Sequence, residues 1–136
     1  MAIERTFSMV KPDGVDRGLI GEVLRRYESN GLKISALRMT RLVPGRTQEF
    51  YGMHRGKPFF DELVAFVSSG PVVGMVVEGE DAIRRVRDIM GATNYKQAIP
   101  GTIRAEFARE ITRNIVHGSD SPESAAREIE FFFGGT

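Results

Sequence analysis

The sequence predicts an α+β fold, in which a four-stranded antiparallel sheet of the split β-α-β, ferredoxin-like type has helices packed around it. Segments with strand-like and helical periodicity follow one another in the order β-α-β-(αα)-β-α-loop-β-α. The 136 residues, 41% hydrophobic and 27% charged, also have the size and composition of one globular domain. We therefore expect a single domain over residues 1–136, with its helices on one face of the sheet and the other face partly open.

The first half of the chain contains two expected strands and three expected helices. Residues 4–10 alternate between polar and apolar side chains, a period typical of strands, and the Lys11–Gly14 segment ends this pattern. Apolar residues recur at three and four positions in the helical segments, and Asn30-Gly31 supplies a stop after the first of them. The expected strands are 4–10 and 32–42, and the expected helices are 19–27, 47–53 and 58–67.

The second half contains two more expected strands. Val72–Val77 is apolar on both faces and rich in β-branched residues, as expected of a central strand. The last helix has clear start signals, because Ser121 can cap it, Pro122 suits its first turn and Glu123 complements its positive end. The expected strands are 72–77 and 114–117, and the expected helices are 80–90, a weak 104–111 and one that begins after Ser121.

Charge and cysteine content exclude several function classes. The 19 basic and 18 acidic residues give a net charge of +1, so the overall charge does not indicate nucleic acid or a membrane surface as a partner. The absence of cysteine excludes thiol catalysis and cysteine-ligated metals. The longest apolar run, Val72–Val77, is far shorter than the roughly 20 residues that span a bilayer. We expect a soluble, cytoplasmic protein with neither a membrane nor a nucleic-acid partner.

The segment Asn114–Ser121 places one of two histidines between an expected strand and an expected helix start. Gly118 and Ser119 are small enough for an anion to approach His117, and the free N–H groups of the next helix favour negative charge nearby. Glu128 lies at the edge of the buried stripe of that helix, so it can hold one imidazole nitrogen and leave the other as a nucleophile. These residues by themselves leave a structural and a catalytic His117 about equally open.

Three separated cations are candidates for phosphate binding, although each also fits an ordinary surface role. Lys11 follows the first strand, Arg87 borders the buried face of its helix, and Arg104 lies in a loop-like region that can fold over a ligand. A guanidinium group can form two parallel hydrogen bonds to the oxygens of one phosphate, whereas a lysine acts as a point charge. No Walker-type loop, carboxylate cage or paired-histidine motif is present in the sequence. We expect His54, the second histidine, at the surface without a catalytic role.

Six short blocks stand out along the chain, and the Asn114–Ser121 block, NxxHGSDS, is the most specific of them. The other five are Lys11–Gly14; Tyr51 with Lys57–Phe60; Ser69–Val72; Gly91–Asn94; and Pro100–Arg104. In this order, and over nearly the whole chain, they resemble the sequence pattern of the nucleoside diphosphate kinase family. The coincidence of six blocks leaves little room for chance.

The resemblance implies a phosphotransferase that moves the γ-phosphate of a nucleoside triphosphate to a nucleoside diphosphate. The mechanism implied is ping-pong, through a phosphohistidine at His117, with broad base tolerance and a role in maintaining NTP and dNTP pools. Phe59 matches the aromatic residue that stacks on the base, and Ile111 matches an aliphatic residue on the other side of it. The matched catalytic positions are His117, Glu128, Ser119, Lys11 and Tyr51, and the matched nucleotide-binding positions are Lys11, Phe59, Leu63, Arg87, Thr93, Arg104, Ile111 and Asn114.

The resemblance also implies a cofactor and partners. Mg²⁺ is expected to be carried by the nucleotide rather than held directly by the protein, with a possible contact from Asp120 through water. The expected partners are nucleoside di- and triphosphates and further copies of the chain, in a hexamer or a tetramer.

Three other functions fit parts of the sequence. A ferredoxin-like sheet can bind RNA through aromatic residues on its strands, but only Phe7 and Phe107 lie near expected strands, and the pI of about 8.1 is not strongly basic. A non-catalytic ligand-binding or assembly module leaves the combination of His117, Glu128 and three cations unexplained. A histidine phosphatase normally has Arg-His-Gly, where this chain has Val116-His117-Gly118.

Overall fold

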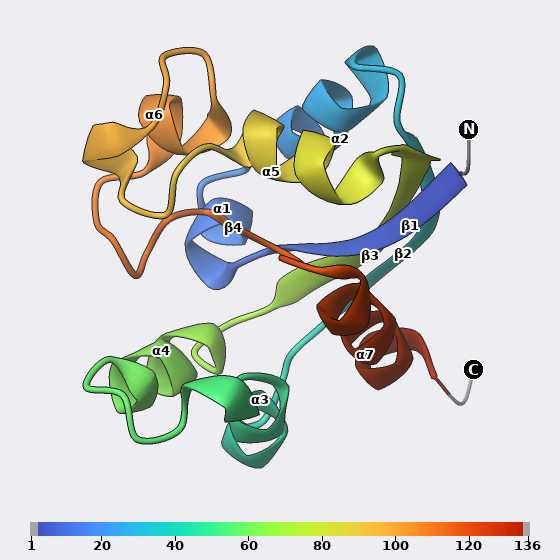
Figure 1. The fold of residues 1–136 in the computed structure, drawn as a ribbon. Helices are drawn as coiled ribbons and strands as arrows, with labels where there is room; N and C mark the ends of the chain where they lie inside the picture. Colours follow the sequence, from blue (N-terminus) through green and yellow to red (C-terminus); the bar gives the residue numbers. More distant parts are fainter. Residues whose placement is uncertain (1–2, 135–136) are drawn as a thin grey trace.

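The computed structural model describes residues 3–134 and contains a four-stranded antiparallel sheet with the strand order β2-β3-β1-β4 (Figure 1). β1 and β3 lie at the centre, β2 forms one edge and the short β4 forms the other. The predicted α+β class and antiparallel four-stranded sheet are therefore confirmed. The strands are β1 Ile3–Val10, β2 Lys33–Thr40, β3 Val72–Glu80 and β4 Val116–Gly118.

Helices lie against both faces of the sheet, so the expectation of helices on only one face is wrong (Figure 1). Alternation along β1 explains this, because Phe7 and Met9 belong to the hydrophobic core on one side and Val10 to the core on the other, all three fully buried. The helices on the Val10 side are α2 Ile20–Ser29, α5 Ala82–Met90 and α6 Ile103–Phe107, and those on the Phe7 side are α3 Pro44–Phe50, α4 Phe60–Val67 and α7 Pro122–Phe133.

The short helix α1, Pro12–Asp16, was not expected from the sequence. The Lys11–Gly14 segment ends the β1 pattern, as predicted, but the chain then enters the short helix α1. Pro12 occupies its first turn, where a missing N–H costs nothing. A helix this short shows no apolar period by which the sequence could indicate it. The remaining elements are α1 Pro12–Asp16 and the 3₁₀ helices η1 Gly52–His54 and η2 Tyr95–Gln97.

Several element boundaries differ from those predicted, and two of them affect the pocket described below. β4 begins at Val116 rather than at residue 114, because Ile115 has a φ of 77° and leaves the extended conformation. The weak helix predicted over 104–111 is α6, which ends at Phe107. At the far end of the sheet, β3 continues to Glu80 because its last residues still pair with β1.

The last helix begins as the sequence predicts. The Ser121 Oγ atom accepts a hydrogen bond from the Ser124 N–H at 3.1 Å, and Pro122 lies in the first turn. This cap fixes the start of α7 next to the end of β4. Across residues 3–134, no helix combines the length and the apolar character needed to cross a membrane.

Candidate active site

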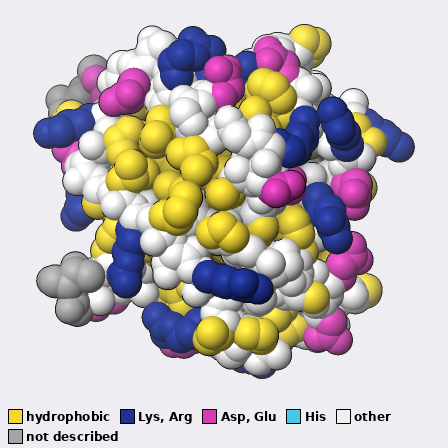
Figure 2. Space-filling view, turned by 180° about the vertical axis from the view of Figure 1, so that it is seen from behind, with side chains coloured by type: hydrophobic (Ala, Val, Ile, Leu, Met, Phe, Trp, Pro, Cys, Tyr) yellow, Lys and Arg dark blue, Asp and Glu magenta, His cyan; other side chains and the backbone are white. Residues whose placement is uncertain are grey.

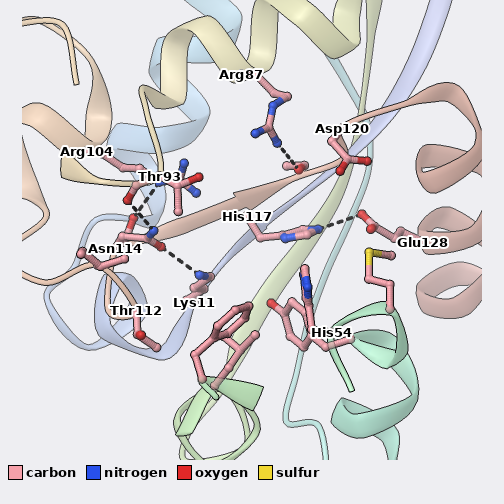
Figure 3. A pocket seen from close by; sticks show the side chains of 16 residues that line it. Lys11, His54, Arg87, Thr93, Arg104, Thr112, Asn114, His117, Asp120 and Glu128 are labelled. Atoms are coloured by element: carbon pink, nitrogen blue, oxygen red, sulfur yellow. Dashed lines mark hydrogen bonds and ion pairs between the residues drawn. The ribbon is translucent and has the colours of Figure 1, made fainter. Parts of the chain in front are cut away.

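A pocket of about 360 Å³ opens beside β4, a size typical of small-molecule sites (Figure 3). Distant parts of the chain form its walls, from Lys11 at the end of β1 to Glu128 in α7. Every predicted site residue except Ser119 lines it, and so does Asp120. The lining residues are Lys11, Tyr51, Met53, His54, Phe59, Leu63, Arg87, Thr93, Arg104, Ile111, Thr112, Asn114, His117, Gly118, Asp120 and Glu128.

His117 lies in the pocket with one ring nitrogen already bonded. Its Nε2 atom is 2.8 Å from Glu128 Oε1 (Figure 3). The same oxygen accepts a hydrogen bond from Ser119 Oγ at 2.7 Å. Glu128 is 3% exposed, so the interaction is little screened by solvent. A carboxylate only accepts, so in the neutral imidazole Nε2 carries the proton and Nδ1 has a free lone pair. Ser119 therefore belongs to the site through Glu128, although it does not line the pocket.

Aromatic rings pack around the imidazole from the Phe7 side of the sheet. The Tyr51 ring meets the His117 ring edge-on, with centroids 5.7 Å apart, and the Phe50 ring does so at 5.3 Å. The Tyr51 hydroxyl is buried without a hydrogen-bond partner in the described part of the chain, and burial raises the pKa of this residue. It therefore remains a neutral hydroxyl beside the pocket. Phe7, a possible RNA-stacking residue in the sequence, is fully buried and does not present its ring to a ligand.

Lys11 is a buried cation at the end of β1. Its Nζ atom donates to Asn114 Oδ1 at 2.8 Å, and the Asn114 Nδ2 atom donates to the Thr93 carbonyl at 3.3 Å (Figure 3). Burial lowers the pKa of Lys11 from 10.5 to about 7; the nearby Arg104 charge lowers it further, and Asp13 opposes the change. In the free protein, this end of the pocket therefore favours an anion that would restore the charge of the ammonium group.

Arg104 does not lie in a loop that folds over the pocket, as expected, but on the buried side of α6. It is 4% exposed, and its guanidinium donates to the carbonyls of Gly91 at 3.0 Å and Val116 at 2.7 Å, with a longer contact to that of Asn114 at 3.4 Å. Burial and the Arg87 charge lower its pKa to about 10, so it stays charged at neutral pH. It ties α6, the 91–93 segment and β4 together while facing the pocket.

Arg87 and Asp120 lie at the opposite end of the pocket from Lys11 (Figure 3). Arg87 extends from α5 and donates to the Gly118 carbonyl at 2.9 Å. A hydrogen bond from Ser124, followed by the Arg87 charge, lowers the pKa of the exposed Asp120 carboxyl. In residues 3–134, no three histidine, aspartate or glutamate side chains converge as a metal site would require.

An apolar end of the pocket is formed by α4 and the segment after α6. Phe59, directly before α4, is 41% exposed, and Ile111 is 53% exposed. Leu63, one turn further along α4, is buried at 7% exposure. The two exposed hydrophobic side chains therefore border a space that has polar groups at one end and apolar groups at the other.

His54, which we expected at the surface, is half-buried. It lines the pocket, with its ring roughly parallel to that of Tyr51 at 6.2 Å and 5.3 Å from that of Phe59 (Figure 3). Burial, and then the Lys57 charge, lowers its pKa. Its position three residues after Tyr51, in the turn η1, was the available signal. The other lining residues that were not predicted are Met53, Thr112 and Gly118.

Several known proteins are similar to this chain in sequence and in fold. A family model described as nucleoside diphosphate kinase matches residues 4–136. The nucleoside diphosphate kinase of Desulfosudis oleivorans is 62% identical over 131 residues, which are 96% of this chain and 94% of the relative. That of Halorhodospira halophila is 56% identical over 133 residues, 98% and 94% of the two chains.

Two solved structures are similar over nearly the whole chain. The nucleoside diphosphate kinase of Aquifex aeolicus has a TM-score of 0.95 and 51% identity, and the match covers 98% of this chain and 97% of that one. The halophilic nucleoside diphosphate kinase of Halobacterium salinarum, solved in complex with CDP, has a TM-score of 0.94 and 49% identity, with 97% and 88% covered.

Proposed function

Since this chain belongs to the nucleoside diphosphate kinase family, we propose that Nδ1 of His117 accepts the γ-phosphoryl group of a nucleoside triphosphate and passes it to a nucleoside diphosphate. The family transfers phosphate by a ping-pong mechanism through a phosphohistidine. The main support for this assignment is the hydrogen bond between His117 Nε2 and Glu128. It leaves Nδ1 of the neutral ring free to act as the nucleophile in the pocket.

In the first half-reaction, the Nδ1 lone pair forms a bond to the γ-phosphorus. The bond from that phosphorus to the β,γ-bridging oxygen breaks, and this oxygen keeps the electron pair and leaves as part of the nucleoside diphosphate. Nε2 keeps its proton, so positive charge develops on the ring opposite the buried Glu128 carboxylate. Ser119 holds that carboxylate in place through its hydroxyl.

The second half-reaction reverses these changes with another nucleotide. A terminal β-phosphate oxygen of the incoming diphosphate bonds to the phosphorus, the N–P bond breaks, and its electron pair returns to Nδ1. Neutral His117 is regenerated with the proton still on Nε2. One pocket can therefore serve both nucleotides in turn, because the first product leaves before the second substrate binds.

We assign Lys11, Arg87 and Arg104 to the phosphates. All three line the pocket with His117, and Arg104 and Arg87 are already anchored by backbone carbonyls. Cations that are fixed before the reaction stabilise transition-state charge without reorganising. Thr93, Asn114 and the Tyr51 hydroxyl provide polar contacts for the phosphates and the ribose.

We assign the apolar end of the pocket to the base. Phe59 presents an exposed ring, with Ile111 as the aliphatic residue expected on the other face of the base and Leu63 beneath. Stacking tolerates any base, because every base has a flat face. The Halobacterium salinarum relative was solved with CDP, which supports a pyrimidine nucleotide as a ligand of this pocket.

We propose that Mg²⁺ comes with the nucleotide, where it neutralises phosphate charge. The pocket fits this arrangement, because its carboxylates are Asp120 and Glu128, and Glu128 is already bonded to His117 and Ser119. Asp120 is exposed and has a lowered pKa, so it presents an ionised carboxylate that can contact a hydrated ion.

We also propose that residues 1–136 act as one domain that assembles as a homo-oligomer. The family match over residues 4–136 supports one domain. The edge strand β2 supports assembly, because Leu37 and Met39 are more than half exposed on it, and hydrophobic side chains gather on the rear face (Figure 2). Light scattering decides between a monomer and a hexamer or tetramer. A cytoplasmic location stays a prediction.

Labelling with γ-labelled ATP tests the assignment of His117. We expect an acid-labile, base-stable phosphoprotein that loses its label to added GDP. Because the chain has two histidines, His117→Asn should abolish the label while His54→Asn keeps it. An equal label on His117→Asn would show that another residue accepts the phosphate.

A further inference from the structure

The backbone two residues before His117 has a conformation that is rare for its residue type. Ile115 has a φ of 77°, and the Val116 N–H donates to the Asn114 carbonyl at 2.9 Å, which closes a three-residue γ-turn. A β-branched residue adopts positive φ only where its surroundings impose it. The turn leads directly into β4, a strand of three residues that carries His117. The direction of that strand therefore depends on what holds the turn.

Asp13 binds the amide at the centre of the turn. Its Oδ2 atom accepts a hydrogen bond from the Ile115 N–H at 3.1 Å, and the Lys11 N–H donates to the Ile115 carbonyl at 2.8 Å. The residues at the start of α1 thus bind both polar groups of Ile115. The other Asp13 oxygen, Oδ1, is buried and has no hydrogen-bond partner within residues 3–134. Among residues 3–134, the hydrogen bond that the Asp13 side chain accepts therefore comes from the turn, through the Ile115 amide.

Close packing makes α1 a rigid support for this contact. A Cβ atom at Gly14 would lie 2.7 Å from Val10 Cγ1 and 3.0 Å from Ile115 Cγ2, so α1 approaches the turn as closely as glycine allows. Ile115 itself is fully buried. A change in the distance between α1 and the turn would open the core.

We propose that Asp13 is a positioning residue, whose hydrogen bond to the Ile115 amide keeps the γ-turn that directs His117 into the pocket. The inference rests on the proposed role of His117. Asp13 also lies near the Lys11 charge, so an experiment must separate its hydrogen bond from its charge. Asp13→Asn keeps an acceptor oxygen and removes the charge, whereas Asp13→Ala removes both. Asp16→Ala, which removes an exposed carboxylate from the same helix, is the matched control.

The test compares single-turnover phosphorylation, nucleotide affinity and amide exchange of Ile115 at pH 6, where Lys11 is mostly protonated in the wild type. Small misplacements of reacting groups cost large factors in rate, so we expect Asp13→Ala to slow phosphorylation by about 10-fold or more. Its nucleotide affinity should change by about 2-fold or less, and its Ile115 amide should exchange faster. Asp13→Asn should stay within about 3-fold of the wild type in rate and keep the Ile115 amide protected. Asp16→Ala should match the wild type.

Two results would overturn the proposal. One is wild-type phosphorylation and Ile115 exchange in Asp13→Ala. The other is an Asp13→Asn variant that is slow or has an unprotected Ile115 amide, and this variant decides the question if Asp13→Ala does not fold. If the wild type itself fails to label His117, the proposed function is wrong, while amide exchange still shows whether Asp13 holds the turn.

Discussion

The Nε2 atom of His117 lies 2.8 Å from Oε1 of Glu128, and this contact engages one ring nitrogen while Nδ1 faces the pocket without a hydrogen bond within residues 3–134. Glu128 is held in turn by Ser119 and lies in a helix whose start is fixed by the Ser121 cap. The α7 helix therefore helps to fix the orientation of the His117 ring, although the ring itself belongs to β4.

Replacement of Glu128 by glutamine should slow phosphorylation of His117 by about 10- to 100-fold. The amide oxygen can still accept from Nε2, but it no longer offsets the positive charge that develops on the ring. Nucleotide affinity should hardly change, because Glu128 supports the ring rather than the phosphates. Single-turnover labelling and equilibrium binding separate the two effects. Glu123→Gln, an exposed change in the same helix, is the control, and equal rates in both variants would contradict the role of Glu128.

Replacement of Phe59 by alanine should weaken the binding of purine and pyrimidine nucleotides by about 1–3 kcal/mol. The loss follows from removal of the exposed ring that we assign to the base. At saturating nucleotide, the rate of phosphoryl transfer should remain near that of the wild type. Phe59→Tyr keeps the ring and should restore affinity. Unchanged affinity in Phe59→Ala, measured by titration calorimetry, would remove this residue from the site.

Nucleotide binding should be accompanied by proton uptake near neutral pH. Lys11 has a pKa of about 7 in the free protein, so it is about half protonated at pH 7. Phosphate oxygens favour its charged form, which raises this pKa in the complex, so Lys11 takes up about half a proton at pH 7 and less at pH 6. Affinity should accordingly fall as the pH rises above 7.

Calorimetry in two buffers with different ionisation enthalpies measures this uptake. The Lys11→Met variant provides the reference, because the protonation of the nucleotide's own phosphates is common to both proteins. The same uptake in the variant and the wild type would assign it to the nucleotide alone.

The two pocket arginines should differ in their effect on stability. Arg104→Met removes a buried donor from the carbonyls of Gly91, Asn114 and Val116, so we expect a loss of about 2 kcal/mol in the free energy of unfolding. Arg87→Met removes one hydrogen bond from a half-buried side chain and should cost about 0.5 kcal/mol. Both variants should lose activity. Urea unfolding measures the difference, and equal losses would contradict the structural role of Arg104.

Periodicity predicted the sheet and most helices because their buried faces leave a regular pattern in the sequence. It could not indicate α1, whose five residues are too few for a period, or the γ-turn at Ile115, where a β-branched residue adopts a conformation against its own preference. The expectation of helices on only one face came from the ferredoxin-like arrangement, because the order of elements along the chain does not show on which face of the sheet each helix packs.

The pocket was predicted by short motifs rather than by spacing. The six blocks contain nine of the sixteen lining residues, but they did not show that Arg104 is tied to backbone carbonyls, since that depends on contacts between distant segments. The place of His54 in the pocket was missed because its one sequence signal, the spacing of three residues from Tyr51, does not by itself show that the two rings meet. Packing against Tyr51 and Phe59 brings it into the pocket.

The apolar end of the pocket has a consequence for how nucleotide pools communicate. Phe59, Leu63 and Ile111 carry only hydrocarbon side chains, which form no hydrogen bonds with the edges of a base. On the proposed assignment any base can occupy this end of the pocket, and the base leaves with its diphosphate, so a phosphoryl group on His117 would retain no record of it. All triphosphates charge one common covalent state, and the phosphorylated fraction of the enzyme reports the energy status of the combined pools rather than that of any one nucleotide.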